Sequence, residues 1–478
     1  MTFKEYSFRE LLINIVDNRG RTCPTSEHGI PLIATNCIKN SGLYPVYEKL
    51  RYVSEETYQT WFRGHPEPGD MIFVCKGSPG RVCWTPDPVP FCIAQDMVAI
   101  RADTTKVYPK YLFALLRSEA VQHQILNMHV GTLIPHFKKG DFANLYLQIP
   151  EDMEYQRRVG DAYFSFCESI EKNHQINQTL EQMAQAIFKS WFVDFEPVKA
   201  KIAALEAGGS EEDALLAAMQ AISGKGEAEL TRLQAEQPEQ YAELRATAEL
   251  LPSAMQDSEL GEIPEGWEVT DLKSSTIEIR RGISPKYTEE GGIQVINQKC
   301  IRNHKVDFSL ARRNDTSKRK IDGREIQIGD VLVNSTGVGT LGRLAPVRHL
   351  PEPSVADSHI TVIRANNRLI SNAFLAGLMI TSEPLIEASG AGSTGQTELR
   401  KQVLEEIVFA RPSLKLSRAY EGAVEPMGQQ MACIERQLVS LASARDVILP
   451  KLLSGDLSVP NKGNQPKAEP LSPLQGVE

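Results

Sequence analysis

The chain contains the same ordered set of segments twice, and this duplication limits the folds that are open to it. The matching pairs are Ile30–Asn40 with Ile293–Asn303, Pro68–Phe73 with Ile328–Val333, and Phe91–Ala102 with Val355–Ala365. Each second copy follows the first by about 260 residues, far beyond the roughly 20–50 residues of a solenoid repeat. We therefore interpret the pattern as one duplicated domain.

Both copies show the same order of predicted local structure. A short β-like run leads into a Gly-rich turn, a helix-like stretch, a polar loop and a last β-like run that ends at a proline. In the first copy these are Met71–Cys75, Lys76–Arg81, Tyr108–Arg117, Gly131–Lys139 and the run up to Pro150. In the second copy they are Val331–Val333, Ser335–Arg343, Asn372–Ile380, Ser393–Lys401 and the run up to Pro412. This order of strands and helices predicts an α+β domain in each copy.

A long helix is predicted after each of these prolines. Apolar or amide residues recur there at alternating steps of four and three, which is the 3.5-residue period of a coiled-coil seam. Such a helix cannot bury its own stripe, so we expect the two helices, each roughly 60 Å long, to pair with each other. Asn173 and Asn177 either fix the register as buried amides or face solvent beside the seam. The predicted seam positions are Val159, Tyr163, Phe166, Ile170, Asn173, Asn177, Leu180, Ala184, Ile187 and Trp191, and Tyr420, Val424, Met427, Met431, Ile434, Leu438, Leu441, Arg445, Ile448 and Leu452.

Charge is distributed unevenly along the chain. The stretch 201–257 is rich in Ala, Glu and Gln, and we expect it to be helical, exposed and weakly packed. Between Lys201 and Glu262 there are 13 acidic and 4 basic residues, which accounts for the whole net charge of −9. Between Ile277 and Leu350 there are 14 basic and 8 acidic residues. The second copy therefore presents either a basic face for nucleic acid or an ordinary solvated surface.

Sequence motifs of cofactor and metal chemistry are missing or stand in the wrong context. The segment Gly337–Gly342 spells GxGxxG, but Pro346 follows where a dinucleotide site needs a helix, so we expect a tight turn. No GxxxxGK[ST] loop, HExxH pair or Asn-Pro-Pro-aromatic tetrad occurs, so we assign this chain no catalytic residue, metal site or cofactor. The eight scattered cysteines indicate free thiols in a reducing cytoplasm, with Cys37 and Cys300 in the core. No run approaches the ~18 apolar residues of a membrane span.

Basic and polar residues near the Gly-rich turns and the polar loops are our candidates for binding DNA. Glycine lets a phosphate backbone approach closely, and a neighbouring lysine or arginine supplies the charge. Each basic residue, taken singly, is equally well explained as an exposed charge without a ligand. The candidates, which include side chains able to read base edges, are Lys76, Arg81, Lys138, Lys139, Arg280, Arg281, Ser335, Arg343, Gln396, Thr397, Arg400 and Lys401.

Three segments carry a resemblance to a known family. Asn177–Val198, which contains Trp-Phe-Val-Asp-Phe, is similar to the central conserved segment of the specificity subunits of type I restriction-modification enzymes. Leu260–Val269, with Ile-Pro-Glu-Gly-Trp, resembles the start of their second target recognition domain, and Pro450–Leu457 resembles the end of their distal conserved helix. This chain departs from the family pattern in two places. The first copy lacks an Ile-Pro-x-Gly-Trp start, and the acidic insert is long. Together with the duplication, the resemblance covers nearly the whole chain.

The resemblance implies a pseudo-two-fold α+β architecture in which two long antiparallel helices separate two target recognition domains. The expected segments are a first recognition domain (1–152), a central conserved helix (153–200), the acidic helical insert (201–257), a second recognition domain (258–413), a distal conserved helix (414–458) and a disordered tail (459–478).

The resemblance also implies a non-catalytic cytoplasmic subunit that reads a split site in double-stranded DNA, with one half-site for each recognition domain. Two methyltransferase (modification) subunits and the restriction/translocase subunits are the implied partners, and they would use S-adenosylmethionine, ATP and Mg²⁺. The aromatic cluster of Trp191, Phe192 and Phe195 either packs under a recognition domain or binds a partner. The rival interpretations are a coiled-coil scaffold whose end domains bind proteins, and a single-chain nuclease or methyltransferase.

Overall fold

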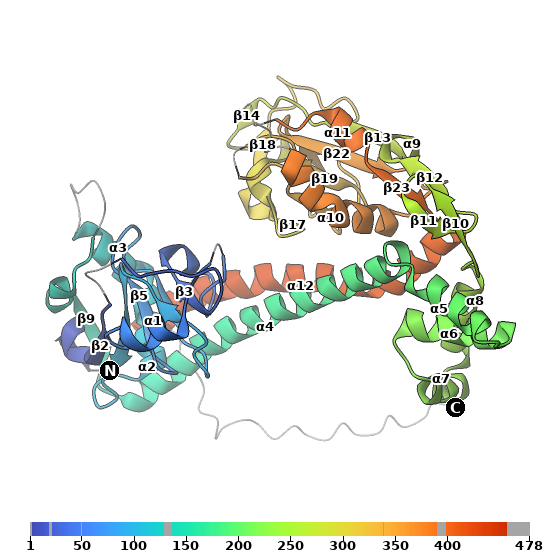
Figure 1. Cartoon of the computed structure of the whole chain (residues 1–478). Helices are drawn as coiled ribbons and strands as arrows, with labels where there is room; N and C mark the ends of the chain where they lie inside the picture. The colour runs from blue at the N-terminus through green and yellow to red at the C-terminus, as the bar shows by residue number, and fades with distance from the viewer. Residues whose placement is uncertain are drawn as a thin grey trace, which may run out of the picture. The chain divides into compact units, whose positions relative to one another are not determined.

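The computed structural model describes residues 2–18, 22–48, 50–128, 136–337, 339–389 and 398–456. The chain divides into two compact units. Unit 1 comprises Met1–Gln175 and Glu435–Glu478, and unit 2 comprises Ile176–Ile434. Each unit combines one copy of the repeat with one part of each long helix, α4 and α12 (Figure 1).

Unit 1 contains a four-stranded antiparallel sheet with the order β2-β8-β5-β6. Strand β5 (Met71–Val74) is buried on both faces, because successive side chains of a strand point to opposite sides and each side meets its own core. Met71 and Phe73 enter one hydrophobic cluster, and Ile72 and Val74 enter another. Two further sheets have the orders β4-β3-β7 and β1-β9.

The remaining elements of unit 1 follow in chain order. The strands are β1 (Phe3–Ser7), β2 (Leu12–Val16), β3 (Ile30–Ile33), β4 (Arg51–Val53), β6 (Val82–Trp84), β7 (Cys92–Ile93), β8 (Met97–Ala102) and β9 (Tyr146–Pro150). The helices are η1 (Phe8–Leu11), η2 (Thr35–Cys37), α1 (Glu55–Thr60), α2 (Pro109–Arg117), α3 (Glu119–Asn127) and η3 (Lys139–Ala143).

Unit 2 repeats this topology, which confirms the predicted duplication. Its main sheet has the order β13-β22-β19-β20, and β18-β15-β21 and β12-β23 correspond to the two smaller sheets of unit 1. The registers also agree, since Met71 pairs with Ile100 in one unit and Val331 pairs with Ile363 in the other. Strand β14 extends the second sheet, and unit 2 has two further strand pairs, β10-β11 and β16-β17.

The elements of the second repeat have the following bounds. The strands are β10 (Met255–Ser258), β11 (Gly261–Pro264), β12 (Glu268–Asp271), β13 (Thr276–Arg281), β14 (Tyr287–Thr288), β15 (Ile293–Ile296), β16 (Ile301–Arg302), β17 (Lys305–Val306), β18 (Arg312–Asn314), β19 (Val331–Asn334), β20 (Leu344–Pro346), β21 (Ser354–Ala356), β22 (Ile360–Ala365) and β23 (Val408–Arg411). The helices are α9 (Leu272–Ser275), η4 (Gln298–Cys300), η5 (Phe308–Leu310), α10 (Asn372–Ser389) and α11 (Lys401–Glu405).

Two predictions of local structure are confirmed in these units. Cys37 and Cys300 are buried at matching positions, and burial raises the pKa of the Cys300 thiol to about 11. The GxGxxG segment forms a turn, in which Leu341 N–H donates to Gly337 O at 3.0 Å. Strand β20 rather than a helix follows that turn, so the geometry of a dinucleotide site is missing there.

The long helices are α4 (Met153–Phe192) and α12 (Leu414–Ser454). None of the twenty predicted seam positions is exposed, which confirms the 3.5-residue pattern. In unit 1 the Tyr155 hydroxyl donates to Leu452 O, and in unit 2 the Tyr420 hydroxyl donates to Ala184 O at 3.3 Å. The helices therefore pack against each other within each unit.

The two seam asparagines differ in their surroundings. Asn177 is 0% exposed, and its side-chain nitrogen and oxygen have no hydrogen-bond partner among the described residues. Asn173 is half-buried. The alternative in which the amides face solvent therefore does not hold for Asn177, which lies in the seam as an unsatisfied polar group.

The acidic insert is helical, as predicted, but it is not weakly packed. It includes the second half of α5 (Glu196–Glu206) and the whole of α6 (Glu211–Ser223), α7 (Glu227–Glu236) and α8 (Pro238–Glu249). Leu215, Met219 and Leu230 are buried in the main hydrophobic cluster of unit 2. The buried Lys201 ammonium donates to Leu251 O at 2.7 Å. The expectation failed because a few apolar residues, spaced along polar helices, suffice to bury one face of each helix.

Among the described residues, no helix combines the length and the apolar character that crossing a membrane requires.

Candidate nucleic-acid interface

An ion pair that occurs in both units fixes the two central strands of each main sheet. In unit 1 the Arg101 guanidinium makes two bonds to the Asp70 carboxylate, at 2.8 and 3.1 Å. In unit 2 Arg364 makes the same two bonds to Asp330, both at 2.7 Å. Each aspartate stands just before the first of these strands, β5 or β19, and each arginine lies near the end of the second, β8 or β22. The pair therefore ties the two antiparallel strands together at one end.

Three chain segments meet at the other end of these strands, and we call this place the loop junction. In unit 1 Cys75 N–H donates to Asp96 O at 2.8 Å, and Phe137 N–H donates to Cys75 O at 2.7 Å. The turn after β5, the turn before β8 and the segment from residue 136 onward are thereby joined. Lys76 and His136 form an isolated antiparallel bridge across the same point.

The loop junction of unit 2 has the same main-chain bonds. Ser335 N–H donates to His359 O, and Leu399 N–H donates to Ser335 O, both at 2.8 Å. Thr336 and Glu398 form the bridge that corresponds to Lys76 and His136. Both copies therefore build one backbone arrangement from different side chains, at the ends of strands and beside Gly-rich turns.

In unit 1 the structure brings together three of the four predicted DNA-binding residues. Lys76 lies in the junction, with its ammonium 4.0 Å from the Asp96 carboxylate. Lys138 and Lys139 are exposed and follow directly after the junction segment, at the start of η3. Arg81 is exposed and lies further along the turn, where its carbonyl accepts the Val74 N–H at 2.9 Å.

In unit 2 Arg281 lies in the junction, and Arg400 and Lys401 follow it. Arg400 and Lys401 are exposed, and Lys401 pairs with Glu405 at 2.8 Å. Arg343 is half-buried at the end of the Gly-rich turn. Ser335 is fully buried, and its hydroxyl lies 2.6 Å from the hydroxyl of Thr361, so its side chain is not presented to a ligand. The candidates Gln396 and Thr397 lie outside the described residues.

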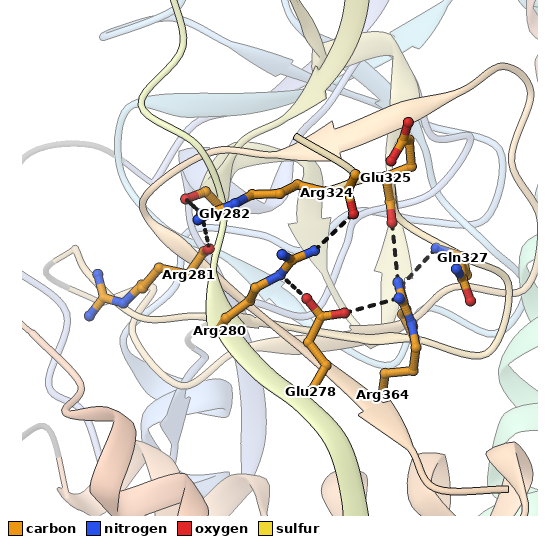
Figure 2. Close-up of polar contacts among 10 residues, drawn as sticks. Glu278, Arg280, Arg281, Gly282, Arg324, Glu325, Gln327 and Arg364 are labelled. Atoms are coloured by element: carbon orange, nitrogen blue, oxygen red, sulfur yellow. Dashed lines mark hydrogen bonds and ion pairs between the residues drawn. The ribbon is translucent and has the colours of Figure 1, made fainter. Parts of the chain in front are cut away.

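Arg280 and Arg281 are neighbours on β13, and their side chains therefore point in opposite directions. Figure 2 shows the Glu278 carboxylate between the guanidinium groups of Arg280 and Arg364. Burial lowers the pKa of Arg280, and the positive charges of Arg324 and Arg364 lower it further. Arg280 thus belongs to a structural network beside the Asp330 ion pair, and its guanidinium is engaged there.

Arg281 points away from that network and fastens the junction. Its guanidinium donates to Ser358 O at 3.1 Å, to Leu399 O at 2.9 Å and to the Glu398 carboxylate at 3.0 Å. Of these two adjacent arginines, Arg281 therefore contacts the loop junction and Arg280 does not, although their side chains are similarly exposed, at 30% and 34%.

The aromatic cluster of the central helix packs inside unit 2. Trp191 and Phe192 are buried, and Phe195 is half-buried. The ring of Phe192 stands 5.9 Å from Trp267, and Phe195 stands 5.5 Å from the same indole. Trp267 lies in the Ile-Pro-Glu-Gly-Trp segment. Of the two alternatives, this cluster therefore packs under the second repeat. Trp191 and Phe192 are 2% and 6% exposed, so they offer little surface to a partner in this conformation.

The candidates predicted from the sequence did not include the acidic and histidine side chains of the two junctions, because they were chosen among Lys, Arg and uncharged polar residues. These residues are Asp96 and His136 in unit 1, and His359 and Glu398 in unit 2. The signal was present, since the repeat alignment places Asp96 opposite His359 in the turn before the second central strand. At this backbone position one repeat thus has a carboxylate and the other an imidazole.

Comparisons with known proteins place the chain in a family. A family profile described as the type I restriction modification DNA specificity domain matches residues 24–182. The HindI specificity subunit of Haemophilus influenzae is 31% identical over 386 residues, which cover 77% of this chain and 81% of that protein. The MjaIX specificity subunit of Methanocaldococcus jannaschii is 22% identical over 364 residues, or 74% of this chain and 70% of that protein.

Among solved structures, the S subunit of a type I restriction-modification system from M. genitalium aligns with a TM-score of 0.47 and 15% identity. That alignment covers 94% of this chain and 96% of the other. On the strength of the Haemophilus relative, this chain belongs to the specificity subunits of type I restriction enzymes.

Proposed function

We propose that this chain binds double-stranded DNA and reads a bipartite target, with one half-site for each repeat. The observation that carries the proposal is the pair of loop junctions. They share their main-chain bonds and differ in side chains, as expected for two readers of different sequences on one scaffold. Exposed lysines and arginines beside both junctions supply charge for phosphate contacts, which position a protein on DNA.

The paired long helices are proposed to set the distance between the two half-sites. They are also proposed to dock two methyltransferase subunits, to which the restriction/translocase subunits attach. In this arrangement the chain carries no catalytic group of its own. S-adenosylmethionine, ATP and Mg²⁺ are used by the partner subunits, and this chain selects the sequence on which they act.

Exchanging residues 258–413 for those of a related specificity subunit tests the proposal. Methylated bases are mapped across the genome of a host that carries the exchanged subunit with its own methyltransferase subunits. We expect one half of the recognised site to change and the other half and the spacer to stay. A change in both halves would contradict independent reading by the two repeats.

The length of the paired helices gives a second test. One heptad is inserted into α4 after Gln175 and another into α12 after Ile434, so that the 3.5-residue seam continues in both helices. Seven residues add about 10.5 Å, which corresponds to roughly three base pairs at ~3.4 Å each. We expect a spacer longer by that amount with both half-sites retained. An unchanged spacer refutes the role of the helices as a ruler.

Salt dependence separates the proposal from a protein-binding scaffold. Phosphate contacts release counterions, so DNA affinity should fall steeply as salt is raised. A scaffold without DNA specificity predicts no such dependence and no half-site. Purified chain that methylates or cuts DNA without partners would instead establish an enzyme.

A further inference from the structure

The two loop junctions carry different side chains at three equivalent backbone positions. Lys76 of unit 1 corresponds to Thr336 of unit 2, through the bridges that each makes. The other two correspondences follow from the same hydrogen bonds and bridges, and they are Asp96 with His359 and His136 with Glu398. At each of these two positions, one unit has an acidic residue where the other has a histidine. Unit 1 has the acidic residue at the first position, and unit 2 has it at the second.

We propose that these three positions determine base specificity, and that Asp96 and Glu398 each accept a hydrogen bond from a base amino group in the major groove. This inference rests on the proposed function, since it names the residues with which each repeat would read its half-site. The six residues are Lys76, Asp96 and His136 in unit 1, and Thr336, His359 and Glu398 in unit 2.

In unit 1 the side chains of Lys76 and Asp96 are accessible and held near each other, whereas His136 is half-buried with its Nε2 atom covered. The side chains of Lys76 and Asp96 are 43% and 37% exposed, and their charged groups stand 4.0 Å apart. Asp96 has a φ of +76°, a conformation that Asp and Asn tolerate better than most residues. Its backbone is also fixed by the bond from Cys75 N–H. The carboxylate is therefore presented from a turn that a main-chain hydrogen bond holds, and a lysine stands beside it.

The side chains of unit 2 are presented in the same way with other chemistry. The Thr336 hydroxyl lies 2.8 Å from Nδ1 of His359, and the His359 side chain is exposed. Glu398 is 69% exposed and is oriented by Arg281 at 3.0 Å. Arg281 itself donates to the carbonyls of Ser358 and Leu399, so its contact with Glu398 fixes the direction of that carboxylate.

A carboxylate on a DNA-binding surface indicates base reading rather than phosphate binding. Phosphates repel it, and the only groups of duplex DNA that it can accept from in the major groove are amino groups, chiefly cytosine N4. Lysine donates to the O6 and N7 of guanine. We therefore expect Lys76 and Asp96 to read adjacent groups of a guanine- or cytosine-containing step, and Glu398 to read an amino group in the other half-site.

A structural role for these side chains is the alternative. In unit 1 the segments are joined by main-chain bonds from Cys75 and Phe137, which no side chain of the three positions supplies. In unit 2 Glu398 contributes a tie to Arg281, but Leu399 contributes two further ties through its main chain. Losing the carboxylate charge therefore leaves both junctions closed, and base preference is the property that should change.

The test uses the full chain in complex with its methyltransferase subunits and a library of randomised duplexes, from which bound sequences are selected and sequenced. The variants Asp96→Asn and Glu398→Gln remove one negative charge from each junction, and Glu56→Gln and Glu289→Gln remove the same charge from exposed positions elsewhere in the two units. Lys76→Met is a second, independent variant of unit 1, which keeps the test decisive if Asp96→Asn does not fold.

We expect the junction variants to lose preference roughly 5- to 150-fold at one base position of one half-site. The other half-site should be unchanged, and the two control variants should select the wild-type sequence. If the junction variants bind more weakly or as tightly but select the wild-type sequence at every position, the inference is overturned and the proposed function stands. A wild-type complex that selects no sequence would instead overturn the proposed function.

Discussion

Replacing Asp330 by alanine should destabilise unit 2 and leave unit 1 intact. Asp330 is 1% exposed, it holds Arg364 by two bonds of 2.7 Å, and it accepts the Gln327 N–H at 2.8 Å. Removing one partner of a buried ion pair costs about 3–5 kcal/mol. Arg364 keeps the Glu278 carboxylate at 2.9 Å, so the cost should lie at the lower end, near 3 kcal/mol.

Hydrogen exchange measures this loss separately in each unit, since amides of a central strand exchange only when their unit opens. A loss of about 3 kcal/mol corresponds to roughly 150-fold faster exchange for the amides of Val331–Asn334. The amides of Met71–Val74 in unit 1 should exchange as in the wild type.

Two variants control this prediction. Asp330→Asn retains an acceptor for the Gln327 N–H and loses the charge, so it isolates the ion pair from the turn that precedes β19. Asp70→Ala is the matched change in unit 1 and should accelerate exchange in Met71–Val74 alone. Unchanged exchange of Val331–Asn334 in the Asp330→Ala protein refutes the stabilising role of the pair, and equal acceleration in both strands refutes the independence of the two units.

Three further predictions concern other parts of the chain. An added Cβ at Gly160 would lie 2.6 Å from the backbone of α2, whereas an added Cβ at Gly422 would meet open space. G160A should therefore lower the free energy of unfolding by about 1–3 kcal/mol, and G422A should raise it by up to about 1 kcal/mol. Denaturant unfolding measures both changes. N177L replaces the two unsatisfied buried polar atoms of the seam by methyl groups on a side chain of the same branching, and it should raise the free energy of unfolding by roughly 1–3 kcal/mol. A decrease would indicate that the amide is satisfied in solution. The pKa of Asp103 is lowered to about 2, chiefly because Lys106 donates to its carboxylate. The stabilisation from the ionised Asp103 is therefore present above about pH 4 and is lost as the pH falls through the folded-state pKa. NMR titration of the Asp103 carboxyl group in the Lys106→Met protein should give a higher midpoint.

The paired long helices and the central strands of the two main sheets could be predicted from the sequence, because periodic apolar positions and repeated segments mark them. Alternating steps of four and three located the seam, and the repeated Gly-Asp and Ile-Arg-Ala segments marked the two central strands of each main sheet. These residues are buried by their own neighbours in a regular element, so local pattern and final environment agree. The paired Asp70–Arg101 and Asp330–Arg364 contacts follow from the same alignment once the strands are known to be adjacent.

The environment of single side chains could not be predicted in the same way. Arg280 and Arg281 look equivalent in the sequence, and only the orientation of β13 sends one into the Glu278 network and the other to the junction. For Trp191 and Phe192, the helical period identifies an apolar patch and does not say whether a domain of the same chain or a partner covers it. In the acidic insert, buried residues such as Met219 and Leu230 are few and far apart in the sequence. They form a core only together with residues from distant segments, which the local pattern does not show.

Each loop junction is closed by main-chain hydrogen bonds, from Cys75 and Phe137 in unit 1 and from Ser335 and Leu399 in unit 2. Amide and carbonyl groups are common to nearly all residue types, so the closure itself places little demand on which side chains stand at the three variable positions. Mutations there can accumulate at low cost in stability. Under the proposed function, single substitutions at these positions would therefore change the target sequence without first requiring compensating changes in the core.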